Sequence, residues 1–402
     1  MAAADLLGDP GFLDDPYPVY ARLREDHPLA RIDFGASVLW LVTRYADVEA
    51  ILKDSRVWKD VTRHPQWGAE SQADGFERSM LFRDPPDHTR LRALVSRAFV
   101  PAVVRTLEPR IAAIVADLLD DLARRGEGDF MADVARPLPV IVIAELLGVP
   151  PADRDGFRRL SELVIRGSDF VTSSAQDMEA SQAASHDLSA YFAGLVAQRR
   201  AAPGDDLLTR LIAAQAEEGR LAEDELLATC NLLLIAGHET TMNLLGNGLV
   251  ALLARPDEVD RLRRDRSLVP SAVEEMLRYD APVQRATFRF AGEAFDLHGQ
   301  TLHAGDQVGC VLGSANRDPA AFPDPDRFDV GREPNRHLAF GRGIHFCLGA
   351  PLARLEATLA VDALIGRFDV DLGTPMRRPG TMFRGYERLP VRLRRLPLPA
   401  RP

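Results

Sequence analysis

One cysteine of the chain stands in a setting that suits a metal-bound thiolate. Cys347 lies in the run Phe-Gly-Arg-Gly-Ile-His-Phe-Cys-Leu-Gly at residues 340–349. The three glycines of that run permit backbone conformations closed to other residues and let a flat group approach the chain. Pro351 suits the first turn of a helix, so Cys347 is expected at or just before a helix amino terminus. Free N–H groups and the helix dipole favour thiolate over thiol there, and the pattern predicts an anionic sulfur ligand.

A polar stretch interrupts a long apolar helix that is predicted over residues 223–254. The centre of this helix is apolar nearly all round, which indicates burial, yet Gly237, His238, Glu239, Thr240 and Thr241 follow in succession. A helix-weakening glycine, a charge and two β-branched hydroxyls break the local pattern, and such breaks point to function. A satisfied polar patch is the alternative. A zinc-protease site is excluded because no second histidine stands four residues after His238.

Helical periodicity dominates the chain, and strand-like stretches are short. Helices are predicted over residues 16–26, 45–53, 87–98, 103–125, 134–147, 187–200, 223–254, 270–279 and 347–367. Strands are predicted over residues 39–43, 288–290, 294–297, 307–311 and 390–393. Residues 318–336, rich in proline and aspartate, are expected to form a packed irregular connector. The chain is therefore predicted to be mainly α with a small β region, and residues 1–402 to form one domain.

Composition and charge exclude several classes of function. The 402 residues carry a formal net charge of −10, which argues against nucleic acid as a partner because phosphate binding needs a basic surface. No membrane-spanning run and no signal peptide are recognised, so a cytoplasmic protein without membrane contact is expected. The three cysteines are too few for a disulfide framework, and a lone buried thiol is the default for each. Nearly all positive charge is arginine, with Lys53 and Lys59 the only lysines.

The run at residues 340–349 resembles the haem-binding loop of the cytochrome P-450 family. Three further stretches resemble signatures of that family in the expected order: His88 to Arg92, Ala236 to Thr241, and the pair Glu275 and Arg278. The resemblance covers nearly the whole chain. It implies the single-domain fold of the family, with a long central helix over a haem b whose iron takes Cys347 as its metal ligand.

The resemblance also assigns roles to individual residues. Contacts with the haem are implied for His88, Arg92, Ala236, Gly237, Arg289, Phe340, Gly341, His345, Cys347 and Gly349. Glu239 and Thr240 are implied to be catalytic, delivering protons to the co-substrate dioxygen, and a local break of the helix is expected at Ala236 and Gly237. Glu275 and Arg278 are implied to form a buried structural pair that Arg327 completes.

A pocket for an organic substrate is also implied by the resemblance. Its expected contacts are Leu233, Ala236, Val283, Ala286, Thr287, Met382 and Phe383, with residues 58–80 and 165–185, although core packing explains any single one equally well. Their mainly apolar character is typical of a site for a lipophilic molecule such as a polyketide, macrolide or terpenoid. Hydroxylation or epoxidation of that molecule is the expected reaction.

Electrons for this reaction must come from outside the chain, because it holds no flavin or iron–sulfur segment and no Gly-x-Gly-x-x-Gly after a strand. NAD(P)H is expected to supply them through a ferredoxin reductase and a ferredoxin, with Arg97, Arg342 and Arg354 as docking candidates on a monomer. Three alternatives stay open. They are a haem-thiolate peroxygenase, a desaturating or ring-coupling enzyme, and a haem-binding sensor or carrier without activity.

Overall fold

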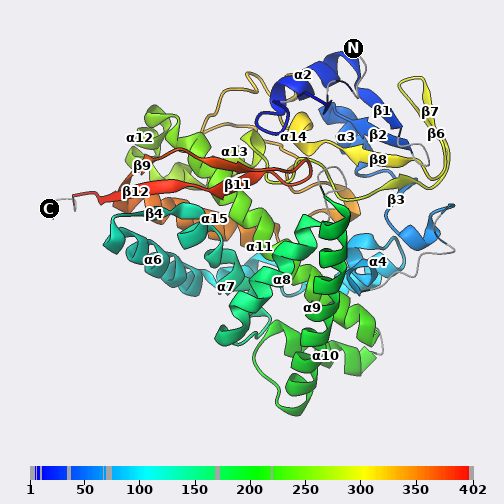
Figure 1. The fold of residues 1–402 in the computed structure, drawn as a ribbon, viewed down its shortest axis with the longest axis horizontal. Coiled ribbons are helices and arrows are strands. Elements are labelled where there is room, and N and C mark those ends of the chain that lie inside the picture. The colour runs from blue at the N-terminus through cyan, green and yellow to red at the C-terminus, as the bar shows by residue number, and fades with distance from the viewer. Residues whose placement is uncertain are drawn as a thin grey trace.

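The computed structural model describes residues 5, 7–9, 11–33, 38–66, 68, 75–167, 173–218 and 221–397. Helices form most of this part of the chain, and the strands are short, which confirms the predicted fold class (Figure 1). The α-helices are α2 Tyr17–Asp26, α3 Tyr45–Ile51, α4 Asp87–Ser96, α5 Pro101–Arg105, α6 Glu108–Arg125, α7 Pro137–Leu146, α8 Arg154–Arg166, α9 Ala175–Ala201, α10 Leu207–Glu218, α11 Glu223–Leu253, α12 Pro256–Arg264, α13 Val269–Tyr279, α14 Leu312–Ala315 and α15 Ala350–Arg367. The strands are β1 Leu29–Asp33, β2 Val38–Val42, β3 Val57–Trp58, β4 Glu127–Asp129, β5 Phe290–Ala291, β6 Phe295–Leu297, β7 Gln300–Leu302, β8 Gln307–Cys310, β9 Phe368–Leu372, β10 Met376–Arg378, β11 Gly385–Arg388 and β12 Pro390–Arg395.

Helix α11 runs through the middle of the molecule (Figure 1). Three acidic residues, Glu223 to Glu225, occupy its first turn, where the positive end of the helix dipole favours them. Most of its later side chains are buried, and it packs against α7, α9, α13 and α15. A helix that is apolar on all sides is stable only inside the protein, so α11 gives the polar residues at its centre a fixed position.

The sheet beside α2 and α3 joins strands that are far apart in the sequence. Its order is β1-β2-β8-β5-β3 in the part of the chain that the structure describes. Strand β2 pairs with β8 in parallel, whereas β3 pairs with β5 antiparallel through Val57 with Ala291 and Trp58 with Phe290. Trp58 with Phe290 is the last pair of this ladder, and the residues that flank it, Lys59 and Arg289, are both cationic.

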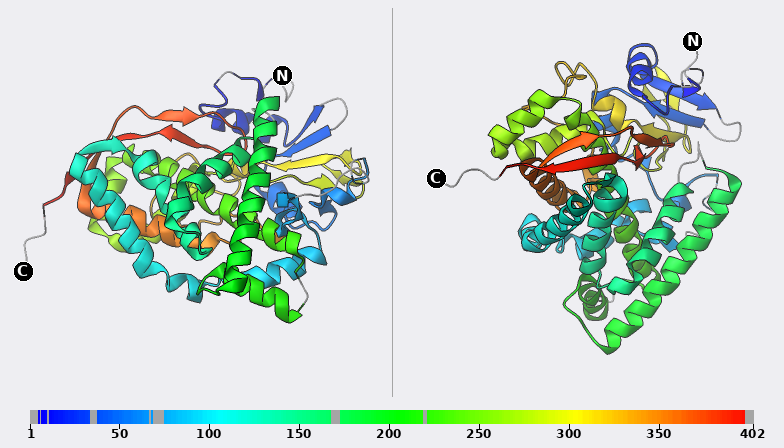
Figure 2. Two further views of the ribbon diagram at one scale, coloured as in Figure 1. Left: turned by 60° about the horizontal axis from the view of Figure 1, so that its bottom comes forward. Right: turned by 60° about the vertical axis from the view of Figure 1, so that its left-hand side comes forward.

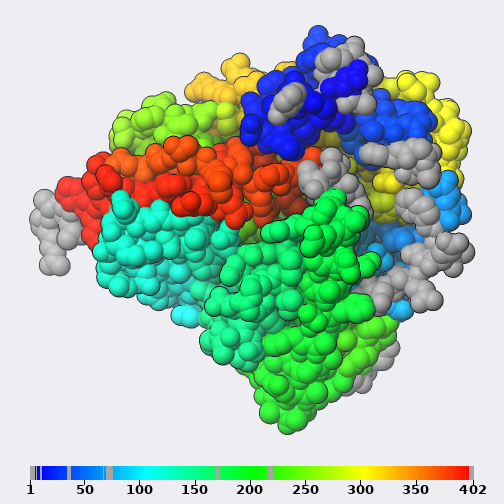
Figure 3. Space-filling view, in the orientation of Figure 1, coloured from blue at the N-terminus to red at the C-terminus, as the bar shows by residue number. Residues whose placement is uncertain are grey.

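The C-terminal strands lie as a band between the N-terminal segment and helices α6 to α8 (Figure 3). Strand β12 pairs with β4 and β9, and β10 pairs with β11. In the right-hand view of Figure 2, α9 and α10 project below the rest of the molecule. Among the described residues, no helix is long and apolar enough to cross a membrane.

Several predicted boundaries differ from the structure. The helix predicted over residues 103–125 is two helices, α5 and α6, because Pro109 can begin α6 but cannot continue a preceding helix. The helix predicted over residues 187–200 is the second half of α9, which begins at a capping box of Ser174 and Asp177. Helices α8, α10, α12 and α14 were not predicted.

Candidate active site

The loop that holds Cys347 is a backbone-bonded turn between the short 3₁₀ helix Gly343–His345 and α15. The Cys347 N–H donates to the Phe340 carbonyl over 2.9 Å, which closes the turn. Gly341 and Gly343 have φ values of 70° and 73°, which only glycine adopts easily. A Cβ on Gly343 would lie 2.5 Å from the Leu52 carbonyl oxygen and 3.3 Å from the Lys53 Cα. Glycine is therefore required at 343 by both conformation and space.

The predicted thiolate at Cys347 meets opposing effects in the protein alone. Burial raises the pKa of the Cys347 thiol, whereas the backbone N–H groups of Gly349 and Ala350 and the charges of Arg92 and Arg354 lower it. Burial outweighs these effects in the protein alone, while the N–H groups at the start of α15 act in the predicted direction, toward thiolate. A bound metal ion changes the balance because a coordinating thiol is deprotonated.

A group of cationic and imidazole side chains gathers near the cysteine loop. The Arg92 Nη2 donates to the Phe346 carbonyl over 2.8 Å, and the rings of His88 and His345 lie 4.3 Å apart between centroids. Burial, then the charges of Arg92 and Lys59, lowers the pKa of His88 to about 4. Burial and the same kind of charges lower the pKa of His345 far below its usual range. Both imidazoles are therefore neutral at pH 7, and the positive charge here belongs to arginine and lysine.

Lys59 belongs to this group, although the sequence offered no motif for it. Its ammonium donates to the Thr287 hydroxyl over 2.6 Å, and burial together with Arg289 lowers its pKa well below the usual range. Arg289, which was predicted, is buried as well, and burial lowers its pKa too. The signal for Lys59 lies in the β3–β5 pairing, which no local pattern reveals.

The polar stretch of α11 is helical throughout, so the predicted break at Ala236 and Gly237 is wrong. The Thr240 hydroxyl donates to the Ala236 carbonyl over 3.1 Å, one turn earlier on the helix. Ala236 is exposed and Gly237 and Thr240 are half-exposed, whereas the flanking turns of the helix are buried. The side of α11 that bears these three residues is therefore accessible in the middle of the molecule.

Glu239 is buried and paired with an arginine that sequence reasoning missed. Arg378, on β10, donates to the Glu239 Oε1, which also accepts from the Asn243 amide over 3.1 Å. Burial alone would raise the pKa of Glu239, but Arg378 outweighs it and holds that pKa below its usual range. The Oε2 atom has no hydrogen-bond partner in the described part of the chain. Glu239 is thus a carboxylate with one free oxygen at neutral pH.

The expected substrate contacts come from two segments that the backbone joins. Val283 pairs with Phe383 in an isolated bridge, and the Gln284 N–H donates to the Met382 carbonyl over 2.8 Å. Leu233 and Met382 are buried, whereas Val283, Ala286 and Thr287 are half-buried. Residues 67, 69–74 and 168–172, within the two longer stretches expected here, lie outside the described residues.

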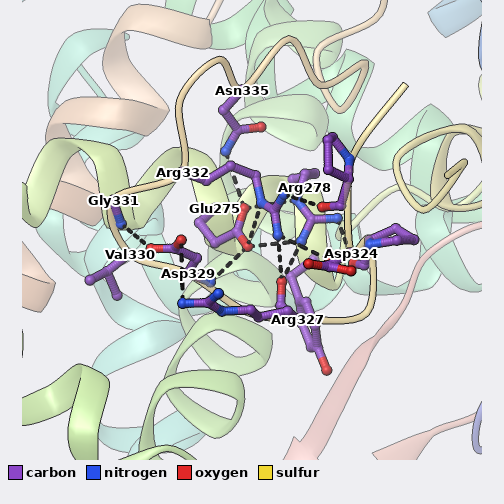
Figure 4. Close-up of polar contacts among 12 residues, drawn as sticks. Glu275, Arg278, Asp324, Arg327, Asp329, Val330, Gly331, Arg332 and Asn335 are labelled. Atoms are coloured by element: carbon purple, nitrogen blue, oxygen red, sulfur yellow. Dashed lines mark hydrogen bonds and ion pairs between the residues drawn. The ribbon is translucent and has the colours of Figure 1, made fainter. Parts of the chain in front are cut away.

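The pair of Glu275 and Arg278 on α13 is fully buried, and its third partner is not the predicted one (Figure 4). The Arg278 Nε and Nη2 donate to the Glu275 carboxylate over 2.7 and 2.8 Å. Arg332, with a side chain 10% exposed, donates to Glu275 Oε1 over 3.2 Å. The Arg327 side chain is 64% exposed, and only its carbonyl accepts from Arg278. The prediction of Arg327 is corrected to Arg332, because the connector folds back and turns the Arg327 guanidinium to solvent.

Known proteins resemble this chain over nearly its whole length. The family model "Cytochrome P450" matches residues 168–384. The cytochrome P450 monooxygenase PikC of Streptomyces venezuelae is 46% identical, covering 96% of this chain and 92% of its own. The polyketide biosynthesis cytochrome P450 PksS of Bacillus subtilis is 40% identical, covering 95% and 96%. The crystal structure of the myxobacterial CYP267B1 with myristic acid has a TM-score of 0.90 at 41% identity, covering 96% and 98%.

The chain therefore belongs to the cytochrome P450 family, and it is a monooxygenase of bacterial type with the single-domain fold of that family.

The family implies a haem, and the residues of this chain fit one. A thiol ends the glycine turn, and three buried nitrogen atoms lack hydrogen-bond partners among the described residues: His88 Nε2, Arg289 Nε and His345 Nε2. Such nitrogen donors and cations suit carboxylates, which a haem b carries as two propionates. Cys347 suits the iron, because thiolate is a haem ligand.

Proposed function

We propose that the chain binds haem b through the Cys347 thiolate and hydroxylates or epoxidises a lipophilic small molecule with dioxygen. The observation that carries this proposal is the glycine-turn cysteine beside buried cations, Lys59 and Arg289, that share the single carboxylate of Asp84 among the described residues. When bound, the haem supplies an iron that activates dioxygen. Arg92, which is bonded to the carbonyl of Phe346, supports the loop on one side of Cys347.

Thr240 and Glu239 are proposed to handle protons. The Thr240 hydroxyl donates to the Ala236 carbonyl and has lone pairs left to accept from a water. Glu239 is ionised at neutral pH, so it takes up a proton before it can deliver one. Its free Oε2 atom is the site for that proton, and adjacent positions on one helix keep the carboxylate and the hydroxyl at a fixed spacing.

The proposed substrate is a polyketide, macrolide or terpenoid-like molecule. The apolar side chains of Leu233, Val283, Met382 and Phe383 support a lipophilic ligand. The names of two similar proteins, a polyketide biosynthesis enzyme and a myristic acid complex, are consistent with this class. Screening such compounds for the spin-state change on binding identifies the ligand that the turnover experiments require.

The central experiment compares the purified wild type with Cys347→Ala. The reduced carbon monoxide complex of the wild type should show the red-shifted band of haem-thiolate proteins, and Cys347→Ala should lose it. The wild type should oxidise the ligand with NAD(P)H, a reductase and a ferredoxin faster than with hydrogen peroxide. A surviving band in Cys347→Ala would exclude Cys347 as the ligand. Turnover with peroxide alone would favour a peroxygenase. Absence of any product would favour a carrier.

The proton role is tested by the coupling of NAD(P)H consumption to product. Thr240→Ala should divert most electrons into peroxide and water, because a hydroxyl that steadies protonation is lost. Thr229 lies on the same helix and makes the same bond to the carbonyl four residues earlier, over 2.7 Å. Thr229→Ala is therefore a matched control that should stay coupled, and equal coupling in Thr240→Ala would refute the role.

A ferredoxin is the proposed electron donor, docked near the cysteine loop. Arg97 is exposed at the end of α4, and Arg342 lies 3.7 Å from Glu49. Arg354 is bound to Glu274 through Nε over 2.7 Å, which makes it the weakest of the three candidates. Neutralising Arg97 and Arg342 to glutamine should raise the KM for ferredoxin severalfold. Arg394→Gln, at an exposed arginine of β12 on the opposite side of the molecule from α4 (Figure 1), should not, and an unchanged KM in the double variant would remove this surface.

A further inference from the structure

Lys59 is a buried lysine to which the proposed mechanism gives no role. Its side chain is 1% exposed. The other lysine of the chain, Lys53, lies at the surface and pairs with Glu49 over 3.4 Å. Taking an ammonium group out of water is costly unless an anion or hydrogen bonds replace the water. The burial of Lys59 therefore calls for a partner.

The fold makes this burial more costly by placing a second cation beside it. Lys59 and Arg289 directly flank the last pair of the β3–β5 ladder, Trp58 with Phe290, and the charge of Arg289 acts on Lys59. Two like charges repel each other, and burial strengthens the repulsion. Arg289 is also buried, and its Nε has no partner in the described part of the chain.

The protein itself supplies too little negative charge to balance the two cations. The Lys59 ammonium donates to the hydroxyl of Thr287, which is neutral. The carboxylate that acts on both cations is that of Asp84, which already accepts the backbone N–H groups of Lys59 and Asp60, each over 3.0 Å. Within the residues that the structure describes, one engaged carboxylate thus faces two buried cations.

We propose that Lys59 binds a carboxylate of the haem, acting with Arg289 as a further anchor of the cofactor. This inference rests on the proposed haem site and adds a residue that none of the family signatures contains. Lys59 acts electrostatically on His88 and His345, which places it among the same donors. The two haem propionates then match the two buried cations in charge. Thr287 holds the ammonium in place through its hydroxyl.

A carboxylic acid substrate is the other source of such a group, and the experiment separates the two sources. The holoenzymes of wild type, Lys59→Met, Lys59→Arg and Lys53→Met are mixed with excess apomyoglobin, and haem transfer is followed by absorbance. Loss of a charge-assisted hydrogen bond should speed haem release from Lys59→Met about tenfold or more. Lys59→Arg keeps the charge and should stay within about threefold of wild type, and Lys53→Met should match wild type.

Three outcomes would overturn the assignment. If Lys59→Met releases haem at the same rate as the wild type, Lys59 is not an anchor. If Lys59→Arg releases haem as fast as Lys59→Met, the charge at this position is irrelevant and the assignment also fails. If Lys59→Met releases haem at the wild-type rate but binds myristate more weakly than its methyl ester, Lys59 would be assigned to an acidic substrate. If Lys59→Met does not fold, Thr287→Val supplies the test through a smaller, about threefold, acceleration. Failure of the haem site itself is distinct, since the wild type would then lack the thiolate spectrum.

Discussion

Arg378 sets the state of the Glu239 carboxylate from a strand that is remote in the sequence. The guanidinium is attached to β10, near the C-terminal edge of the fold, whereas Glu239 lies in the central helix. Because the pair holds Glu239 ionised, a proton must reach the free Oε2 atom from elsewhere. The pair therefore governs how readily Glu239 can take part in proton transfer.

Arg378→Gln should raise the pKa of Glu239, because burial then acts without its main opponent. Leaving a buried charge without its partner should also cost about 3 kcal/mol of unfolding free energy. Denaturant unfolding of the holoenzyme measures the stability, and product formed per NAD(P)H, which should fall, measures the proton supply. Arg388→Gln, at an exposed arginine of the neighbouring strand β11, is the control and should change neither quantity.

The residues that could be predicted are those whose own neighbours in sequence define their chemistry. The loop of Cys347 is a local turn, so its glycines and cysteine could be read directly. Lys59 and Arg378 could not, because each acquires its role from a partner that the fold brings from far along the chain. The placing of Arg327 failed for a related reason: residues 318–336 form no regular element, and their path decides which arginine reaches Glu275.

At the scale of elements, α13 is fixed to the connector by its buried acid. Glu275 accepts from Arg278, Arg332, the Asp329 N–H and the Asn335 amide. A fully satisfied buried carboxylate of this kind joins a helix to an irregular segment as firmly as regular structure would. The connector can therefore lack helices and strands and still hold one conformation.

Arg332→Gln should destabilise the protein by about 3 kcal/mol, because a buried carboxylate loses a charged partner. Arg327→Gln should cost less than about 0.5 kcal/mol, since that side chain is exposed. Both are measured as shifts in the urea midpoint at constant m. Equal losses in the two variants, or a larger loss in Arg327→Gln, would restore the original assignment.

Glu274 links α13 to α15 and should make the stability depend on pH. Burial would raise its pKa, but hydrogen bonds from Arg354 and His337 outweigh burial and lower the pKa to about 2. Between that value and the usual 4.5, the unfolded chain binds a proton that the native state does not, so the free energy of unfolding decreases as the pH is lowered.

From pH 6 to pH 3.5, the wild type should therefore lose about 1 kcal/mol more unfolding free energy than Glu274→Gln. Denaturant titrations at the two pH values give the difference between the variants. His337 bonds to Glu274, whose carboxylate opposes the lowering of the His337 pKa by burial, so the same comparison is repeated in a His337→Gln background that removes the imidazole titration from both proteins. An equal loss in the two proteins would show that the carboxyl does not titrate in this window.

The helices with strong apolar periodicity were predictable, and the pairing of strands was not. The central helix matched its prediction to within one residue at its end, because a long buried segment has few alternatives. Strand β2 pairs with β8, far along the chain, and periodicity carries no information about such partners. Helices α8 and α12 have clear amphipathic patterns that were overlooked, so those omissions do not reflect a limit of the sequence.

At the scale of the whole molecule, Asp280 joins three distant parts of the chain. Its carboxylate accepts from Tyr17 on α2, Arg377 on β10 and Arg384 before β11, over 2.8, 3.1 and 2.7 Å. Arg384 also donates to the carbonyls of Leu13 and Asp14. The N-terminal segment and the C-terminal strands are thus tied to the end of α13 through one buried acid.

Asp280→Asn should lower the unfolding free energy by about 3 kcal/mol, because two arginines lose the charge that compensates their burial. Glu127→Gln is the control: this glutamate pairs with Arg392 and both side chains are exposed, so its loss should cost less than about 1 kcal/mol. Chemical denaturation of the holoenzymes measures both. A small loss in Asp280→Asn would mean that the hydrogen bonds of the amide replace the ion pairs.

Attachment chemistry follows from the placement of the two lysines. Lys59 is buried and Lys53 is exposed, so an amine-reactive support can couple to the Lys53 side chain but not to that of Lys59. The backbone of Lys53 touches Gly343 in the cysteine turn. Enzyme coupled to an electrode or bead through this amine should have the cysteine turn facing the support. This orientation favours direct electron transfer from the electrode and hinders access of a soluble reductant to the turn.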